Sequence, residues 1–178
     1  MDNAYRKASA DYSRNYAEYL VERKADKKII LARTGIILLE VILMLALLVV
    51  VLNYNPFIGA VALLLILFVG VTLWRKTSIE YEYLIVSGEL SMDRINGQRK
   101  RKHIAEFDVK TAEVIAPLAE TNLDGANVIF AASSLNDENV YCAIYKDEKG
   151  NKTALIFNVY DKALELLHYY NKQTVIKK

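Results

Sequence analysis

The sequence of 178 residues has few of the residue types that form disulfides, metal centres and common catalytic sites. Its one cysteine, Cys142, permits no internal disulfide and lies in a strand-like run, typical of a buried apolar residue. Only two histidines occur, His103 and His168, and there is no paired-cysteine spacing for a metal. Ser133 and Asp137 fit turn chemistry better than a nucleophile and its base. Glycine-rich phosphate loops and the Gly-x-Ser-x-Gly and His-Glu-x-x-His motifs are absent, so we expect no catalytic residues, no metal, no cofactor and no enzyme activity.

Charged residues are almost absent from one long part of the chain. Residues 34–52 contain a single charged residue, Glu40, and residues 56–74 contain none. At a rise of about 1.5 Å per residue, each run covers roughly the 30 Å of a bilayer core. Only the four residues Asn-Tyr-Asn-Pro at 53–56 join the two runs. The pattern predicts a transmembrane helical hairpin over residues 29–76.

Basic residues lie at only one end of this predicted hairpin, the end at which the chain enters and leaves it. The connection between the two runs carries no charge, whereas lysine and arginine crowd both outer flanks: Arg6, Lys7, Arg14, Arg23, Lys24, Lys27, Lys28 and Arg33 before the first run, and Arg75 and Lys76 after the second. Cytoplasmic flanks of membrane helices are enriched in these residues. We therefore predict a multi-pass protein of the inner cell membrane with both termini in the cytoplasm.

Glu40 is the one polar group that needs an explanation within the predicted spans. It lies seven residues, roughly 10 Å, beyond Arg33, where a carboxylate is costly unless it is protonated, paired or hydrated. Three interpretations remain open: a proton or ion site, a polar contact between subunits, or a protonated carboxyl that bonds to a backbone carbonyl or to Thr72. The first would make the chain a small transporter or channel subunit.

Residues 1–28 carry a helical pattern without proline or glycine. Four tyrosines, Tyr5, Tyr12, Tyr16 and Tyr19, fall on one side of the predicted amphipathic helix, with basic and acidic residues opposite. Such a face could lie in the headgroup region, pack on the cytosolic domain or contact a second copy of the chain. A solvated, partly frayed helix is the remaining alternative.

After residue 77 the periodicity changes from helical to two. Two sets of residues alternate over 78–85, which is typical of a half-buried strand, and Asn96-Gly97 is a strong hairpin turn signal. We predict strands at 78–85, 89–95, 98–103, 107–115, 128–133, 140–146 and 153–158, followed by a helix at 160–171. The predicted fold is an α+β membrane protein whose residues 77–178 form a seven-stranded antiparallel sandwich or barrel with a C-terminal helix.

This element order is that of a pleckstrin-homology domain, and part of the sequence resembles the bacterial versions. Residues 81–90, Tyr-Glu-Tyr-Leu-Ile-Val-Ser-Gly-Glu-Leu, precede a basic strand and then residues 104–109, Ile-Ala-Glu-Phe-Asp-Val. This succession resembles bacterial pleckstrin-homology-like (PH-like) domains. The chain after Lys28 is also similar to an uncharacterised family of small bacterial two-span membrane proteins with such a domain. The resemblance implies a binding fold and supplies no catalytic residues.

A basic cluster is the clearest predicted surface feature. Its members are Arg75, Lys76, Arg94, Arg99, Lys100, Arg101 and Lys102, followed by His103. The resemblance implies an inositol phosphate site, but alternate residues of a strand face opposite ways, so one compact pocket would use only half of them. We predict looser attraction to anionic phospholipid headgroups, at about 1 kcal/mol per basic residue. Solvated edge-strand charge is the alternative, and the lack of stacking aromatics argues against nucleic acid.

The expected function is therefore binding at a membrane. We expect a membrane-anchored binding or scaffold protein whose PH-like domain supports a protein contact or self-assembly at the cytoplasmic surface, with anionic lipid as a second partner. The contact could use an unpaired sheet edge or the tyrosine face of residues 1–28. The alternative is the small transporter or channel subunit that uses Glu40.

Overall fold

The computed structural model describes residues 15–53, 56–97 and 99–177. The chain forms two compact units, which are described separately. One comprises Met1–Lys24, Glu80–Ile95 and Arg99–Lys178, and the other comprises Ala25–Ile79 with Asn96–Gln98. The fold is α+β, with two long helices, two four-stranded sheets and a C-terminal helix.

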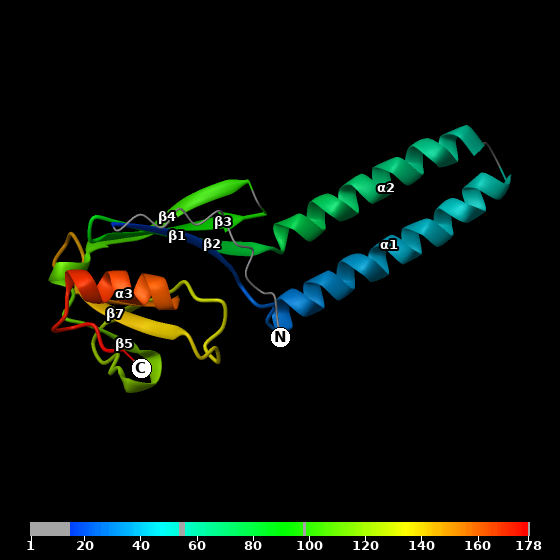
Figure 1. The fold of residues 1–178 in the computed structure, drawn as a ribbon. Coiled ribbons are helices and arrows are strands. Elements are labelled where there is room, and N and C mark those ends of the chain that lie inside the picture. Colours follow the sequence, from blue (N-terminus) through cyan, green and yellow to red (C-terminus); the bar gives the residue numbers. More distant parts are fainter. Residues whose placement is uncertain (1–14, 54–55, 98, 178) are drawn as a thin grey trace. The chain divides into compact units, whose positions relative to one another are not determined.

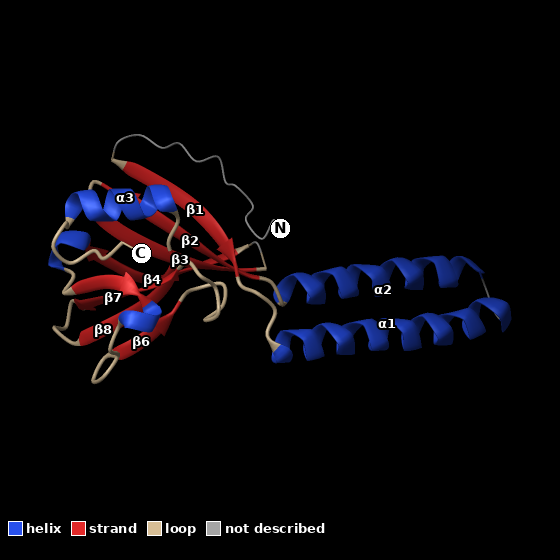
Figure 2. Cartoon of the chain, turned by 60° about the horizontal axis from the view of Figure 1, so that its bottom comes forward, coloured by secondary structure: helices blue, strands red, loops and turns tan. Residues whose placement is uncertain are grey.

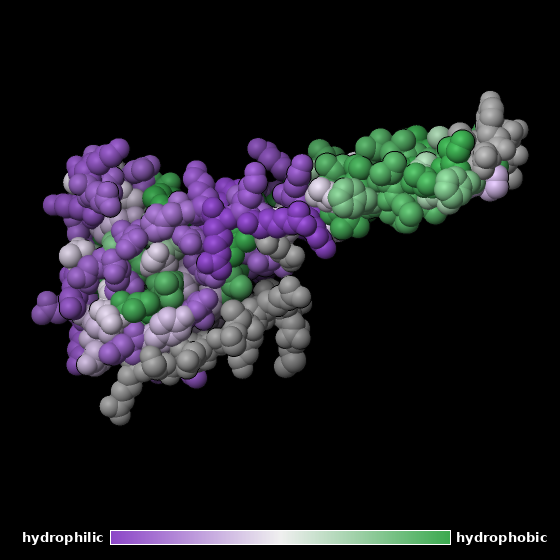
Figure 3. Space-filling model, turned by 90° about the horizontal axis from the view of Figure 1, so that it is seen from above, coloured by the Kyte–Doolittle hydropathy of each residue, from purple (hydrophilic) through white to green (hydrophobic). Residues whose placement is uncertain are grey.

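The second unit is a helical hairpin of α1 (Lys27–Asn53) and α2 (Pro56–Lys76). Asp26 caps α1, because its Oδ1 accepts a hydrogen bond from the Ile29 N–H at 2.9 Å. Proline is favoured at the first position of a helix, which Pro56 occupies in α2. Both helices are long and apolar enough to cross a membrane, and apolar side chains cover the face of the hairpin seen in Figure 3.

The two helices meet along a seam of residues spaced three and four apart. On α1 the less exposed positions include Ile29, Arg33, Ile36, Glu40, Met44, Leu47 and Val51, and on α2 they include Gly59, Ala62, Ile66, Gly70 and Leu73. The two glycines are buried because the opposite helix fills their side-chain space. A Cβ at Gly59 would overlap Val51, and one at Gly70 would overlap the carboxyl group of Glu40. Most other side chains of the hairpin are exposed.

The first sheet of the other unit has the order β1-β2-β3-β4. Its strands are β1 (Tyr16–Glu22), β2 (Ile79–Val86), β3 (Glu89–Asn96) and β4 (Lys100–Asp108). β1 pairs antiparallel with β2, with Tyr19 opposite Tyr83. Because β1 precedes the helices and β2 follows them, the hairpin is an insertion between two neighbouring strands of one sheet (Figure 1).

The prediction of a helix over 1–28 is wrong for residues 16–22. Ala17, Tyr19 and Val21 are buried while their neighbours are more exposed, which is the alternation of a strand. Pairing with β2 overrides the helical spacing of the tyrosines. Tyr5 and Tyr12 lie outside the described residues. The division of the chain at residue 77 consequently leaves out a strand that belongs to the sheet.

The second sheet has the order β5-β7-β8-β6. It consists of β5 (Val114–Pro117), β6 (Asn127–Phe130), β7 (Val140–Lys146) and β8 (Lys152–Asn158). The tight turn after β7 places β8 beside it, so β6 takes the other edge of β8 and runs parallel to it. The expected purely antiparallel arrangement is therefore wrong at this edge.

Strand boundaries also differ from the prediction around residue 110. The single strand expected at 107–115 is divided, because Asp108 caps the short 3-10 helix η1 (Val109–Thr111), which separates β4 from β5. With β1, the described residues form eight strands instead of the seven predicted. A second short 3-10 helix, η2 (Leu118–Glu120), follows β5. The predicted C-terminal helix is confirmed as α3 (Asp161–Tyr170), which buries Ala163, Leu166 and Leu167.

Aromatic side chains join the two sheets, which face each other in Figure 2. Tyr19 and Tyr83 stack with ring centroids 4.7 Å apart, and Tyr83 contacts Phe157 of β8. The Tyr19 hydroxyl donates to the carbonyl of Asn158 at 2.9 Å. Phe107 of β4 stacks on Tyr145 of β7 at 4.1 Å. Because Tyr19 is only 6% exposed, it is a core residue, and its predicted place on an interface is wrong.

Substitutions at adjacent positions of β1 test the strand. Val21 is fully buried, so Val21→Ala should lower the free energy of unfolding of the sheet unit by about 2 kcal/mol. Leu20 is only half-buried, so Leu20→Ala should cost clearly less. Denaturant unfolding of the full chain in mild detergent, followed by near-ultraviolet circular dichroism of the tyrosines, measures both. Equal losses of unfolding free energy in the two variants would contradict the alternation of buried and more exposed positions along β1.

Candidate functional site

The predicted basic cluster is distributed over several elements. Arg75 and Lys76 form the last turn of α2, Arg94 lies on β3, and Arg99 to Lys102 enter and begin β4. The residues from Arg99 to Lys102 are all exposed. Within the described residues, Arg99, Lys100 and Lys102 have no hydrogen bond or ion pair from their side chains. These three side chains therefore remain available for a ligand.

One end of the helical hairpin is strongly cationic. The start of α1 and the end of α2 meet there, because Arg33 Nε donates to Thr77 Oγ1 at 3.0 Å and its guanidinium lies 5.1 Å from the ring centroid of Trp74. The basic residues at this end are Lys27, Lys28, Arg33, Arg75 and Lys76, which outnumber the capping Asp26. The described residues at the opposite end, Asn53, Pro56 and Phe57, are uncharged. The charge asymmetry seen in the sequence is thus a property of the folded hairpin.

The turn between β3 and β4 packs on this cationic end. The Gly97 N–H donates to the carbonyl of Ser78 at 2.9 Å. Gly97 has a φ of +59°, and a Cβ there would come within 3.0 Å of the Arg75 carbonyl oxygen. Both the backbone conformation and the close approach require glycine. Arg99 and Lys100 follow this turn directly in the chain.

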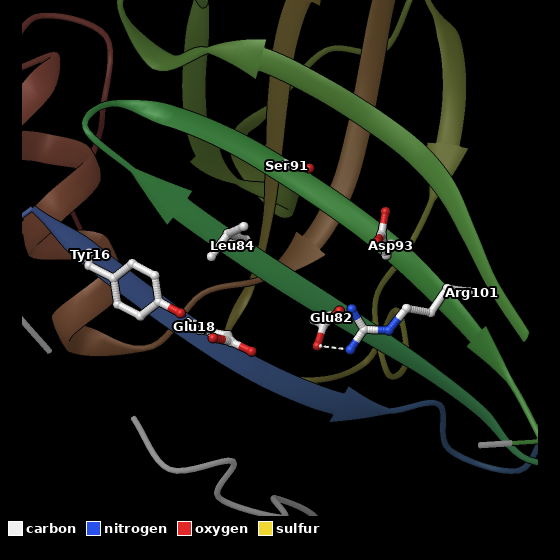
Figure 4. A pocket seen from close by; sticks show the side chains of 7 residues that line it. All are labelled: Tyr16, Glu18, Glu82, Leu84, Ser91, Asp93 and Arg101. Carbon is white, nitrogen blue, oxygen red and sulfur yellow. Dashed lines mark hydrogen bonds and ion pairs between the residues drawn. The ribbon is translucent and has the colours of Figure 1, made fainter. Parts of the chain in front are cut away.

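Arg101 belongs to a different site, a pocket on the outer face of the first sheet (Figure 4). The pocket has a volume of about 210 Å³. All four strands of the sheet contribute to its lining, which consists of Tyr16, Glu18, Glu82, Leu84, Ser91, Asp93 and Arg101. Three carboxyl groups face one guanidinium, so the lining has an excess of negative charge. This pocket is unsuited to an inositol phosphate.

A buried carboxyl group lies at the centre of this lining. Glu82 is 8% exposed and accepts a hydrogen bond from Arg101 Nη2 at 2.8 Å. Burial raises the pKa of Glu82, and this outweighs the opposing effect of Arg101; Glu18 and Asp93 raise it further. His103 Nδ1 lies 3.0 Å from Asp93 Oδ1. Arg101 and His103 are therefore engaged with acidic partners, unlike Lys100 and Lys102.

Sequence reasoning missed the acidic members of this pocket. The alternation of glutamate and tyrosine over residues 79–86 could have identified Glu82, since it places Glu82 opposite to the buried tyrosines. Glu18 could not be found in this way, because β1 was expected to be a helix. Tyr16, expected at an interface, lines the pocket, and its hydroxyl donates to Glu18.

A second polar cluster fastens the chain where it leaves β1. The Lys24 N–H donates to the Ser133 carbonyl at 2.9 Å, and Lys24 Nζ binds Asp137 Oδ1 at 2.5 Å. The Ser133 hydroxyl also donates to Asp137. Burial raises the pKa of Asp137, but the hydrogen bonds from Lys24 and Ser133 outweigh burial and hold it below its usual value. This arrangement attaches the 131–139 loop to the segment before α1.

Glu40 is the middle residue of the 27-residue helix α1. Its side chain is half-buried and lies over Gly70 in the seam of the hairpin. No hydrogen bond joins Glu40 to Thr72, whose hydroxyl donates to the Phe68 carbonyl at 2.8 Å. Within the described residues, Glu40 forms no hydrogen bond or ion pair. The structure thus brings Glu40 together with Gly70, a contact that the sequence analysis did not predict.

No group of three or more His, Cys, Asp or Glu residues among the described residues has the geometry of a metal site. Cys142 is buried on β7, where burial raises the pKa of its thiol to about 11. A thiol in this state is a poor nucleophile.

A family model described as Bacterial PH-like domain (DUF6106) matches residues 13–177. The chain belongs to this family. No curated protein and no solved structure matches the chain. The match begins before β1 and continues through α3, so the PH-like family pattern includes the helical hairpin as well as both sheets.

Two acidic groups with opposite pKa shifts should give this PH-like protein opposite responses to pH. Folded Glu82 holds its proton more tightly than the unfolded chain, so its contribution to stability is full below about pH 4.5 and is lost as the pH rises through the raised pKa. Folded Asp137 has a lowered pKa, so its contribution is present above about pH 3.8 and is lost as the pH falls.

Glu82→Gln should therefore gain stability relative to the unmodified chain as the pH rises from 4 towards 7, whereas Asp137→Asn should lose relative stability as the pH rises from 3 towards 5. Unfolding of the full chain in detergent across this pH range, followed by tyrosine circular dichroism, measures both differences. Parallel pH profiles for the unmodified chain and either variant would contradict the assigned shift.

Proposed function

We propose that this PH-like chain is a membrane-anchored binding protein. Its sheet unit would contact a protein partner or a second copy at the cytoplasmic surface of the inner membrane, with anionic phospholipid as a second ligand. The observation that carries this proposal is the insertion of two long apolar helices between β1 and β2. A binding domain whose sheet continues into both helices through links of a few residues is well suited to hold a ligand at the membrane.

The exposure of the helices supports an anchoring role. Leu38, Leu64 and Phe68 are 58%, 68% and 70% exposed, and many other large apolar side chains of the hairpin are similarly exposed. In water this surface would be unfavourable by about 25 cal/mol for each Å². A bilayer removes that cost. The cationic end of the hairpin then favours the cytoplasmic side for both flanking segments.

The charges of the sheet unit support two kinds of contact. Arg99, Lys100 and Lys102 are exposed and suit anionic headgroups, each contributing about 1 kcal/mol near the surface. The pocket around Glu82 has the opposite charge, so it would be repelled by the same headgroups. The pocket face is therefore better suited to a protein contact, while lipid binding involves the start of β4. Arg101 is excluded from the proposed lipid set because it binds Glu82.

Membrane fractionation tests the anchor. The full-length chain should remain in the bacterial membrane pellet after an alkaline carbonate wash. Leu64→Arg should weaken retention, because a charge near the middle of a span costs about 2.5–3.5 kcal/mol. Leu135→Arg is the matched control, since Leu135 is an equally apolar residue, 57% exposed, in the sheet unit. Extraction of the unmodified chain by carbonate would contradict the proposal.

Hydrogen–deuterium exchange in nanodiscs tests the lipid contact. The full chain is needed, because a fragment starting at residue 77 would lack β1. Backbone amides of residues 99–103 should exchange more slowly in discs with anionic lipid than in neutral discs, and added salt should remove the difference. Combined substitution of Arg99, Lys100 and Lys102 by Ala should also remove it, whereas Arg101→Ala should leave it. Equal exchange in both lipids would exclude this contact.

A further inference from the structure

Glu40 is a polar group at the centre of an apolar helix, and it has no hydrogen-bond or ion-pair partner among the described residues. It is the middle residue of α1, and no other charged residue occurs among residues 34–52 or 56–74. In hydrocarbon a carboxyl group that lacks a hydrogen-bond partner is unfavourable, and ionisable residues at such a depth usually pair with one another or with backbone carbonyls. The position therefore requires a partner that the described hairpin does not supply.

The possible partners within the hairpin are already engaged or absent. Thr72 donates to the Phe68 carbonyl, and Arg33 binds Thr77 and Trp74 near the cationic end. The seam positions around Glu40 are Ile36, Met44, Ile66, Gly70 and Leu73, which have no polar side-chain atoms. No titratable group of either helix faces the carboxyl group at this level.

Gly70 makes room for the Glu40 carboxyl group against α2. The Glu40 side chain fills the space where a side chain at position 70 would lie, so one side of it packs on the α2 backbone. Gly70 is buried there, whereas Glu40 is only half-buried and keeps part of its surface exposed. We call this partly exposed carboxyl group, seated over Gly70, the polar notch of an otherwise apolar surface.

We propose that this notch is the contact between two copies of the chain, in which the Glu40 carboxyl groups hydrogen-bond to each other. A carboxyl group that holds its proton has one donor and one acceptor, so it is complementary to a second copy of itself. In a two-fold contact, a residue at the symmetry axis meets the same residue of the other copy, and the proposal places Glu40 at that axis. One such contact satisfies two otherwise unpartnered groups. The inference rests on the proposed membrane anchor and names its partner as a second hairpin.

Energy transfer between donor- and acceptor-labelled copies of the full chain in neutral lipid vesicles tests this contact. Labels on a C-terminal tag leave the buried Cys142 untouched. The unmodified chain and Glu40→Gln should both associate, because the amide keeps a donor and an acceptor. Glu40→Leu keeps the size but removes the hydrogen bonds, and should raise the dissociation constant about ten-fold.

Two glycine variants separate the notch from general helix packing. Gly70→Ala displaces the Glu40 carboxyl and should weaken association, whereas Gly59→Ala introduces the same methyl group against Val51, away from Glu40, and should leave it unchanged. Carbonate-resistant retention of each variant shows that the anchor itself persists. A monomeric unmodified chain, equal association of Glu40→Leu, or equal effects of the two glycine variants would overturn the contact while leaving the anchor intact. Proton flux that disappears in Glu40→Gln would also overturn it.

Discussion

The pairing of β1 with β2 is the interaction on which the rest of the structure depends. These strands are separated in sequence by the whole helical hairpin, yet they pair over seven positions from Tyr16–Val86 to Glu22–Glu80. Closing such a connection costs entropy that grows slowly with its length. The cost is reduced because the helices return antiparallel, so Arg33 already meets Thr77 within the hairpin. Sheet pairing and helix packing therefore require the same closure and support each other.

The register of this pairing assigns each residue of β1 to one of two roles. Tyr19 and Val21 face inward, where the Tyr19 hydroxyl bonds the Asn158 carbonyl and connects the two sheets. Tyr16 and Glu18 face outward and line the acidic pocket with Glu82. A shift of one position would bury Glu18 and expose Tyr19, which the core cannot tolerate. The same register that stabilises the sheet thus also builds the pocket.

The sequence predicted those features that depend on local patterns. The long apolar runs indicated the two helices, and the alternation over 78–85 indicated β2 and its buried tyrosines. β1 was missed because its partner lies more than fifty residues away and its tyrosines also fit a helical spacing. The parallel place of β6 depends on which edge β7 leaves open, and no local pattern encodes that. The Glu40–Gly70 contact was missed for a similar reason, because it depends on how the two helices align.

The basic cluster illustrates why neighbours in sequence need not act together. Lys100, Arg101 and Lys102 are consecutive, but Arg101 binds the buried Glu82 across the sheet, while the lysines have exposed side chains. The carboxyl groups of Glu18, Glu82 and Asp93 outnumber the Arg101 guanidinium on this face, so its lining keeps an excess of acidic groups. A cationic surface near the start of β4 and an acidic surface on the outer face of the sheet cannot both favour an anionic leaflet. In the proposed membrane-anchored state, these opposite charges would turn the start of β4 towards the lipid and the pocket around Glu82 towards a partner.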